Sequence, residues 1–295
     1  MNQIDLVETK ANGSTESFKV DERVDCTTRD GSEEAYEIEP GEIIGRGGNA
    51  VVCECRSIGS GEAFAIKIQI DTRGKRLQRF KREEQLLFSL HHDQLMSCVG
   101  HGEIQFCDQH IKWKKCPFVI MPLAELNLSK FIQHSEHTLP FESIAGQFRG
   151  LSEALAVLHE HAIHRDIKPE NVLIRGETWM LSDFGLCRFL DPEDNGPDVT
   201  GDNENIGPKN WLSPEAMNRT LGCGDEITKA SDVFQLAAVF WFAATGRHPT
   251  GIVKATDWTG PKAVFEVLAA SLSHNPSQRP PDGKAFHEQI KAALF

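Results

Sequence analysis

The pattern of hydrophobic and polar positions changes partway along the chain. Before Ala124, apolar positions alternate with polar ones or form short runs, and glycine-containing turns separate these runs. Such a pattern is typical of β-strands in an antiparallel meander. Residues 75–90 instead have apolar residues at helical spacing, so one helix is expected there. The expected strands cover 36–45, 49–58, 63–70, 102–107 and 116–121.

After Ala124 the spacing of apolar residues is mostly helical. Short loop and strand pieces are expected over 162–183. The expected helices cover 126–134, 141–161, 213–219, 229–245, 261–273 and 282–294. A small β-rich part followed by a larger helical part predicts an α+β protein.

The first 35 residues do not fit either pattern well. Residues 1–35 are polar and rich in Asp, Glu, Thr and Ser, and they show little periodicity. We therefore expect an N-terminal extension that is mobile or laid on the surface.

Composition narrows the range of functions. The 295 residues carry a formal net charge of −12, which argues against broad nucleic-acid binding and against a polybasic membrane anchor. No hydrophobic leader and no apolar stretch of about 18 residues occurs, so we expect a cytoplasmic protein. The eight cysteines form no CxxC pair, which predicts reduced thiols rather than a zinc site.

A glycine-rich turn, Gly45-x-Gly47-x-x-Ala50-x-Val52, joins two expected strands. Glycines let backbone N–H groups approach phosphate oxygens closely. Because the turn leads into a strand and not into a helix, it does not match a dinucleotide-binding turn.

Lys67 lies 15 residues after Val52 in an expected strand, where a lysine can reach phosphates. Such a lysine needs a carboxylate to hold it. Glu83 on the following helix is the candidate, because it lies at the edge of an apolar stripe. Glu84 is the alternative if the helix is rotated.

The most specific signal is the segment His164-Arg165-Asp166-Ile167-Lys168-Pro169-Glu170-Asn171, with Asp183-Phe184-Gly185 beginning 12 residues after Asn171. With these motifs the sequence resembles the eukaryotic-type protein kinase family, of the serine/threonine type, from about Tyr36 to Phe295. The resemblance implies a bilobal fold forming one catalytic domain. A β-rich N-lobe with one main helix would cover 36–124, and a mostly helical C-lobe would cover 125–295.

The resemblance also implies catalytic roles. Asp166 would accept or orient the proton of the attacking hydroxyl, and Lys168 would lie near the transferring phosphoryl group. Asn171 and Asp183 would hold Mg²⁺, for which Mn²⁺ is an alternative. The expected reaction transfers the γ-phosphoryl group of ATP to serine or threonine hydroxyls of protein substrates.

Nucleotide contacts are implied in the first part of the chain. Lys67 would contact the α- and β-phosphates, braced by Glu83, near the turn that contains Gly45 and Gly47. A strand and a hinge would offer apolar surface, a backbone carbonyl and an N–H group to adenine. The residues expected around the adenine ring are Val52, Ala65, Met121, Pro122, Leu123 and Ala124.

Two further matches bear on the architecture. Ser213-Pro214-Glu215 resembles the APE-type segment of the family, and Arg279 is its expected ion-pair partner. Asp232 would anchor the backbone of the catalytic loop. Small-molecule phosphotransferases of kinase-like fold generally lack the APE-type segment, so a protein substrate is favoured over that alternative.

Some positions depart from the family pattern. Ala50 replaces the third glycine of the turn, and Pro208 stands where serine/threonine kinases usually carry threonine. A proline there, followed by a tryptophan, resembles tyrosine kinases, whereas Lys168 favours serine/threonine specificity. Lys168 carries more weight, because it belongs to the loop that would touch the reacting atoms. From Pro249 to Asn275 the chain is short, with little room for the helix that usually follows there.

The segment between Asp183 and Glu215 is acidic, and Thr200 is the only serine or threonine between Arg188 and Trp211. Thr200 is a candidate autophosphorylation site, because the arginine at the position of Arg165 often pairs with an activation-loop phosphate in this family. The alternative is that carboxylates of this acidic segment already satisfy Arg165. A pseudokinase scaffold that binds ATP or a partner without turnover remains the alternative to an active kinase, and the sequence predicts no oligomeric state.

Overall fold

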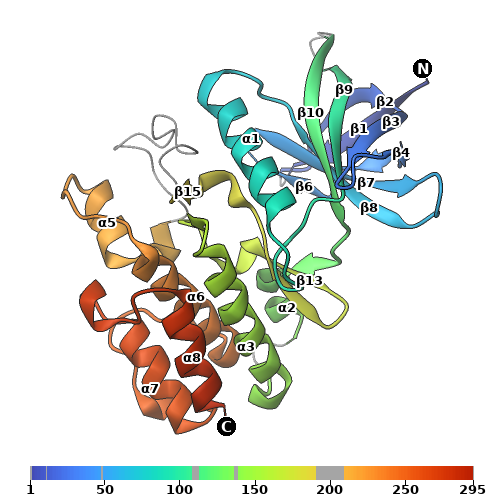
Figure 1. Ribbon diagram of the computed structural model, residues 1–295. Helices are drawn as coiled ribbons and strands as arrows, with labels where there is room; N and C mark the ends of the chain where they lie inside the picture. Colours follow the sequence, from blue (N-terminus) through green and yellow to red (C-terminus); the bar gives the residue numbers. More distant parts are fainter. Residues whose placement is uncertain are drawn as a thin grey trace. The chain divides into compact units, whose positions relative to one another are not determined.

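The structure, a computed structural model, describes residues 2–10, 12–47, 49–107, 113–135, 139–190 and 209–294. The chain forms two compact units. The first comprises Met1–Ser89 and Met96–Leu123, and the second comprises Leu90–Leu95 and Ala124–Phe295. Strands dominate the first unit and helices the second (Figure 1), in agreement with the expected α+β class.

Within the described residues, the first unit holds a ten-stranded sheet. Its strands are β1 (Gln3–Thr9), β2 (Thr15–Asp21), β3 (Arg23–Thr28), β4 (Glu33–Ile38), β5 (Gly41–Glu42), β6 (Gly45–Arg46), β7 (Ala50–Ser57), β8 (Ala63–Gln69), β9 (Gly100–Cys107) and β10 (Trp113–Pro122). The first strand expected from the sequence, 36–45, is divided among β4, β5 and β6. The parallel pair β1–β5 departs from the expected meander.

Six of these strands pair in a closed ring. Their order is β10-β8-β7-β4-β3-β9, and β9 pairs again with β10. Closure requires β3 to meet β9, where Thr27 pairs with His101 and Thr28 with Gly100. A Cβ atom added to Gly100 would lie 2.5 Å from Sγ of Cys26, so glycine permits this close approach. The ring therefore leaves none of its six strands as an open edge along its full length.

The N-terminal strands correct an expectation from the sequence. Residues 1–35 are not a mobile or surface-laid extension, because β1, β2 and β3 are integral to the sheet. Their inward side chains alternate with polar ones in each strand. In each strand the alternation extends over only a few residues and is flanked by charged residues, so it is easily missed beside longer periodic segments. The residues buried in the core of the sheet from this segment are Leu6, Phe18, Val20, Val24 and Cys26.

One helix belongs to the first unit. Helix α1 (Gly74–Ser89) corresponds to the helix expected over 75–90, with small shifts at both ends. Its buried face contains Phe80, Leu86 and Leu87, together with the single carboxylate Glu83. The apolar stripe therefore carries a charged group into the interior of this unit.

The second unit is built around helices. The described ones are α2 (Leu128–His134), α3 (Phe141–Leu158), α5 (Pro214–Thr220), α6 (Lys229–Thr245), α7 (Lys262–Ser271) and α8 (Gly283–Ala293). Helix α6 is apolar nearly all round, and most of its residues are buried. On it, the ring of Phe240 stacks on Phe148 of α3 with centroids 4.0 Å apart, and lies 5.9 Å from Phe286 of α8. Helices α3, α6 and α8 thus share one aromatic core, and α3 and α8 run side by side (Figure 1).

Short elements connect these helices. Between α6 and α7 the chain forms only the 3₁₀ turn η4 (Ala255–Asp257), as expected for a shortened segment. The other short elements are β11 (Leu126–Asn127), β12 (Ala162–Ile163), η1 (Pro169–Asn171), β13 (Val172–Arg175), β14 (Thr178–Leu181), η2 (Phe184–Leu186), β15 (Arg188–Phe189), η3 (Lys209–Trp211) and η5 (Pro276–Gln278).

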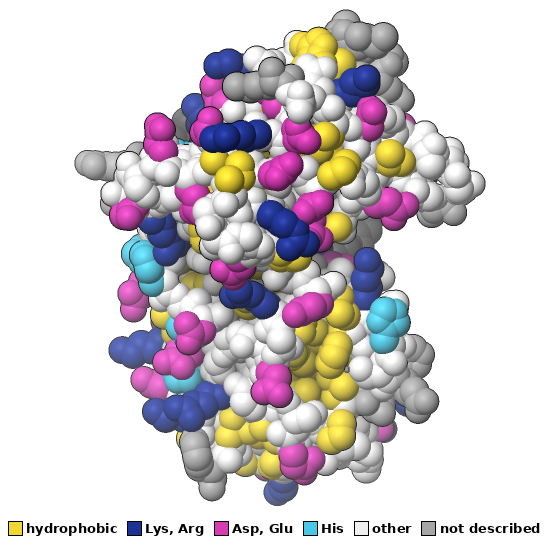
Figure 2. All heavy atoms as spheres, turned by 90° about the vertical axis from the view of Figure 1, so that its right-hand side faces the viewer, with side chains coloured by type: hydrophobic (Ala, Val, Ile, Leu, Met, Phe, Trp, Pro, Cys, Tyr) yellow, Lys and Arg dark blue, Asp and Glu magenta, His cyan; other side chains and the backbone are white. Residues whose placement is uncertain are grey.

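The surface carries charges of both signs. On the face drawn in Figure 2, acidic and basic side chains are interspersed, with apolar side chains between them. In the described part of the chain, no helix combines the length and the hydrophobicity needed to cross a membrane.

Candidate active site

The loop between β12 and η1, together with η1 itself, brings together three of the residues expected at a catalytic centre. Nζ of Lys168 lies 2.7 Å from Oδ2 of Asp166, and Nδ2 of Asn171 donates to the same oxygen at 2.9 Å. Nδ2 of Asn171 also donates to the backbone carbonyl of Asp166 at 2.9 Å. Only 5% of Asp166 is exposed, so a buried carboxylate is held in place by one cation and one amide.

The surroundings of Asp166 tune its affinity for a proton. Burial raises the pKa of Asp166, Lys168 opposes this shift, and the negative charge of Asp183 adds to it. A carboxylate with a raised pKa is a stronger base than an exposed aspartate. The site is therefore suited to accept or orient a proton.

Asp232 in the first turn of α6 anchors this loop, as expected. Its carboxylate accepts hydrogen bonds from the backbone N–H groups of His164 at 2.6 Å and Arg165 at 2.8 Å. Nδ1 of His159 accepts from the N–H of Gly283 at 2.8 Å, which leaves Nε2 to donate to Asp232 at 3.0 Å. Burial opposes ionisation of Asp232, but these partners outweigh it and lower its pKa. His159 was not predicted from the sequence, because no local pattern distinguishes it from a surface histidine.

Backbone strain is concentrated at the same site. Among the described residues, Arg165 with φ of 70° and Asp183 with φ of 62° are the non-glycine residues in the left-handed region. This conformation costs about 1–3 kcal/mol at a non-glycine residue and persists only where the surroundings impose it. Asp183 directly precedes η2, and the ring of Phe184 lies 5.4 Å from that of His164. His164 in turn places Nε2 3.2 Å from the carbonyl of Ser182.

Asn171 and Asp183 have the chemistry of magnesium ligands. The Nδ2 atom of Asn171 is directed to Asp166, so its amide oxygen is the atom that remains for a cation. Carboxylate and amide oxygens are hard ligands of the kind Mg²⁺ accepts, with phosphate oxygens and water completing the shell. The described residues contain no cluster of three or more His, Cys, Asp or Glu side chains that would hold a metal alone.

In the first unit, the structure decides between two candidate partners of Lys67. Nζ of Lys67 lies 2.5 Å from Oε1 of Glu83, and Glu83 is 4% exposed. Oε1 of Glu84 instead contacts Nδ1 of His101. The helix rotation expected from the position of Glu83 beside the apolar stripe is therefore the one observed.

Strand register places four candidate nucleotide-binding residues on one face of the sheet. Val52 of β7 lies opposite Lys67 of β8, and Met121 of β10 lies opposite Ala65 of β8. Cross-strand partners point to the same side, as do residues two apart in one strand. Val52, Ala65, Lys67 and Met121 therefore share a face.

The glycine-rich turn directly precedes β7, and the expected hinge directly follows β10, so both are next in sequence to the strands that form this face. In the turn, the N–H of Gly47 donates to the carbonyl of Ala50 at 3.0 Å. A Cβ atom at Gly45 would meet Cβ of Val52 at 3.4 Å, whereas Gly47 has open space around it. Pro122 ends β10, and the chain passes from the first unit to the second between Leu123 and Ala124.

The expected ion pair between Glu215 and Arg279 is present. The two guanidinium nitrogens donate to the two carboxylate oxygens at 2.7 and 2.9 Å. Burial opposes the charge on Glu215, but Arg279 and the hydroxyl of Ser231 lower its pKa overall. This pair fixes the start of α5 against the segment before α8.

Several expectations fall on parts of the chain that the structure does not describe. Thr200, Pro208 and the acidic residues from Asp191 to Glu204 lie outside the described residues, as does Gly48 in the turn. Their proposed roles stay predictions.

The comparison with known families agrees with this arrangement. A sequence model described as "Protein kinase domain" matches residues 38–290. The chain belongs to the protein kinase domain family. The resemblance carried by the catalytic loop and the DFG segment is thereby confirmed.

Two of the proteins similar to this protein kinase domain come from bacteria. It is 30% identical to the probable serine/threonine-protein kinase SCO3848 of Streptomyces coelicolor, over 72% of this chain and 30% of that protein. It is 28% identical to the serine/threonine-protein kinase PknB of Mycolicibacterium smegmatis, over 76% of this chain and 34% of that protein. The chain thus spans about a third of the length of these relatives.

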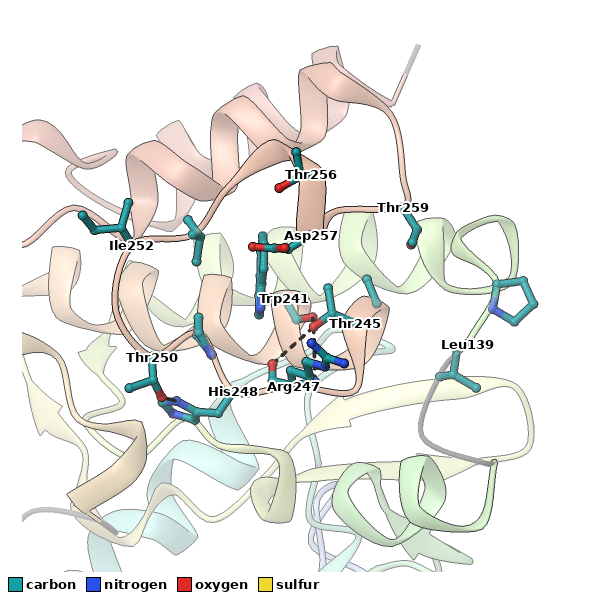
Figure 3. A pocket seen from close by; sticks show the side chains of 14 residues that line it. Leu139, Trp241, Thr245, Arg247, His248, Thr250, Ile252, Thr256, Asp257 and Thr259 are labelled. Carbon is teal, nitrogen blue, oxygen red and sulfur yellow. Dashed lines mark hydrogen bonds between the residues drawn. The ribbon is translucent and has the colours of Figure 1, made fainter.

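A separate pocket of about 770 Å³ lies in the second unit of the kinase domain. Its wall includes the end of α6, with Trp241 and Thr245, and the loop that carries His248 and Ile252 (Figure 3). Oγ1 of Thr245 donates to the carbonyls of Trp241 and Arg247, which shapes the turn after the helix. None of the predicted catalytic or metal-binding residues lines this pocket.

Proposed function

We propose that this chain is an active serine/threonine protein kinase that transfers the γ-phosphoryl group of ATP, with Mg²⁺, to hydroxyls of protein substrates. The observation that supports it most is the geometry around Asp166. A buried carboxylate with a raised pKa is held by Lys168 and Asn171, so that one oxygen is fixed and the other can receive the substrate hydroxyl.

Each residue has a role in that reaction. Asp166 accepts the proton of the attacking hydroxyl, or orients it for attack. Lys168, which already contacts the carboxylate, places positive charge beside the transferring group. Asn171 and Asp183 hold Mg²⁺, which neutralises charge on the phosphates. Lys67 binds phosphate oxygens and is kept in position by Glu83.

Adenine binding is proposed at the face shared by Val52, Ala65 and Met121. The carbonyl of Pro122 accepts a hydrogen bond from adenine and the N–H of Ala124 donates one, with Leu123 between them. The register of β7, β8 and β10 supports this placement. Serine/threonine preference is supported by Lys168 and by the names of the relatives.

The test is a phosphoryl-transfer assay with radiolabelled ATP and a generic basic protein, comparing wild type with Asp166→Asn. Without the base we expect transfer to fall by roughly 10²–10⁴-fold, while nucleotide binding persists. Phosphoamino-acid analysis of the product should give phosphoserine and phosphothreonine. Asp25→Asn, which removes an exposed carboxylate from β3, is the matched control.

Two outcomes would contradict the proposal. Transfer that is equally low in wild type and Asp166→Asn, with nucleotide binding retained, would identify a scaffold without turnover. Phosphotyrosine as the main product would overturn the hydroxyl preference but leave the kinase activity standing.

A further inference from the structure

Arg46 lies in β6, between Gly45 and Gly47 at the start of the glycine-rich turn, and its side chain is held by the N-terminal hairpin of β1 and β2. Its guanidinium forms an ion pair with Glu8 of β1 and lies 3.7 Å from a carboxylate oxygen of Glu16 of β2. The guanidinium carbon also lies 5.1 Å from the centroid of the Phe18 ring. One side chain of the turn thus meets three residues of the hairpin.

The two carboxylates that meet Arg46 would repel each other without a cation. Glu8 and Glu16 are directly opposite in the β1–β2 register. Like charges at opposite positions destabilise a strand pair. Lys10 forms an ion pair with Glu16, and the bond to Lys10 lowers the pKa of Glu16. Arg46 is then the cation that compensates Glu8, so hairpin and turn stabilise each other.

The backbone makes a second connection between the same elements. Strand β5, which leads into the turn, pairs in parallel with β1, and the N–H of Ile43 donates to the carbonyl of Val7 at 2.9 Å. Oγ1 of Thr9 donates to Glu42 at 2.9 Å. The hairpin therefore holds residues 41–43, directly before the glycine-rich turn, in addition to Arg46.

The hairpin is itself firmly anchored. Leu6 and Val20 are fully buried, and Phe18 is 4% exposed with its ring 5.5 Å from that of Phe106 in β9. Strand β2 pairs with β9 at Lys19 and Val20. All of β1, β2 and β3 precede residue 38, where the match to the protein kinase domain begins. The three strands therefore lie before the part of the chain that matches the family model.

We infer that the β1–β2 hairpin is a positioning element for the glycine-rich turn, acting through Arg46 held by Glu8 and Glu16. It restrains the turn whose backbone binds the phosphates of ATP, and so it strengthens nucleotide binding. Arg46 is a positioning residue, because its side chain is directed to the hairpin. The inference rests on the proposed function for its effect on ATP, but the restraint itself does not.

Hydrogen–deuterium exchange without nucleotide tests the restraint directly. Amide hydrogens exchange through local opening, so a turn released from the hairpin exchanges faster. In Glu8→Gln and Arg46→Gln we expect exchange at residues 45–47 to rise about threefold or more, with exchange in β8 unchanged. Asp5→Asn is the matched control, since it removes a carboxylate of β1 that does not contact Arg46. Equal exchange in all variants and wild type would overturn the inference.

Nucleotide affinity tests the consequence. The Kd for Mg²⁺-ATP, measured by fluorescence with an ATP analogue, should rise about threefold to tenfold in Glu8→Gln and Arg46→Gln, and KM for ATP should follow with kcat nearly unchanged. The difference in Kd between wild type and these variants should shrink at high salt, because salt screens the partly exposed ion pair of the wild type. A turn that exchanges faster with an unchanged Kd would overturn the positioning role. A wild type that binds ATP without transferring phosphate would overturn the proposed function alone.

Discussion

Two ion pairs of similar chemistry, one in each unit, differ in what surrounds them. Lys67 and Glu83 in the first unit keep 16% and 6% of their side chains exposed, whereas Arg279 and Glu215 in the second keep 0% and 4%. Arg279 donates not only to Glu215 but also to the carbonyls of Ser273, Ala230 and His274, at 2.8, 3.1 and 3.0 Å. Its guanidinium carbon also lies 4.9 Å from the ring of Phe234.

From this difference we infer a structural role for the Arg279 pair and a role in the reaction for the Lys67 pair. A guanidinium that satisfies its donors on the protein has no capacity left for a substrate, and its fork suits a fixed bidentate contact. A lysine ammonium at the border of solvent can exchange partners when a phosphate arrives. We therefore expect the Arg279 pair to control stability and the Lys67 pair to control turnover.

The largest expected effect follows from Arg279→Met. Removing the guanidinium leaves Glu215 buried without its cation, which typically costs about 3–5 kcal/mol of folding free energy. Urea unfolding followed by circular dichroism should show this loss, with nearly normal activity per folded molecule well below the melting temperature. Arg56→Met, which breaks an exposed pair with Glu39 on the sheet, should cost about 1 kcal/mol or less. Equal losses in the two variants would remove the distinction between the pairs.

Lys67→Met should show the opposite combination. Without the ammonium that is proposed to bind the phosphates, we expect phosphoryl transfer to fall by about 10²–10³-fold. The loss of unfolding free energy should be smaller, about 1–2 kcal/mol, since the lysine borders solvent. Initial rates and urea unfolding on the same preparation give both numbers. Lys115→Met on β10 is the control, because it removes an exposed ion pair with Glu103. A Lys67 variant that is unstable yet fully active would contradict the assignment.

The two pairs also show how far the sequence alone reaches. The apolar stripe of the helix was enough to predict that Lys67 would meet Glu83. The resemblance to the protein kinase family implied that Glu215 would meet Arg279 and that Asp232 would bind the catalytic loop. Each of these is a specific residue type within a long, ordered motif. The contributions of His159, Gln235 and Ser182 to the catalytic loop were not predicted. Oε1 of Gln235, for example, accepts a hydrogen bond from the N–H of Ile167 in this loop at 3.2 Å. Their roles depend on packing between helices and loops far apart in the chain.

The fold was predictable where the apolar periodicity extends over many residues or where a motif fixes the position of the neighbouring elements. Helices α1, α3 and α6 were expected close to their observed ends, because several turns of apolar spacing are hard to misread. The strands β1, β2 and β3 were not, since each offers few alternating positions between charged residues. Ring closure by β3 and β9 depends on pairing between residues 27–28 and 100–101, a long-range contact that no local pattern encodes.

The smallest effect is a dependence on pH that should distinguish the buried pair from an exposed one. Because the pKa of Glu215 in the folded protein lies below its usual value of 4.5, its ionised form contributes stability that is present above pH 4.5 and lost as pH falls through the folded pKa. The difference in unfolding free energy between wild type and Glu215→Gln should therefore shrink on acidification below pH 4.5. Glu266→Gln, which alters an exposed pair with Lys262, should show a small difference from wild type at every pH. Urea unfolding between neutral pH and the acid limit of the folded state measures both curves. If the Glu215→Gln difference stays constant across this range, Glu215 is not the ionised partner of Arg279, and the structural half of the comparison fails.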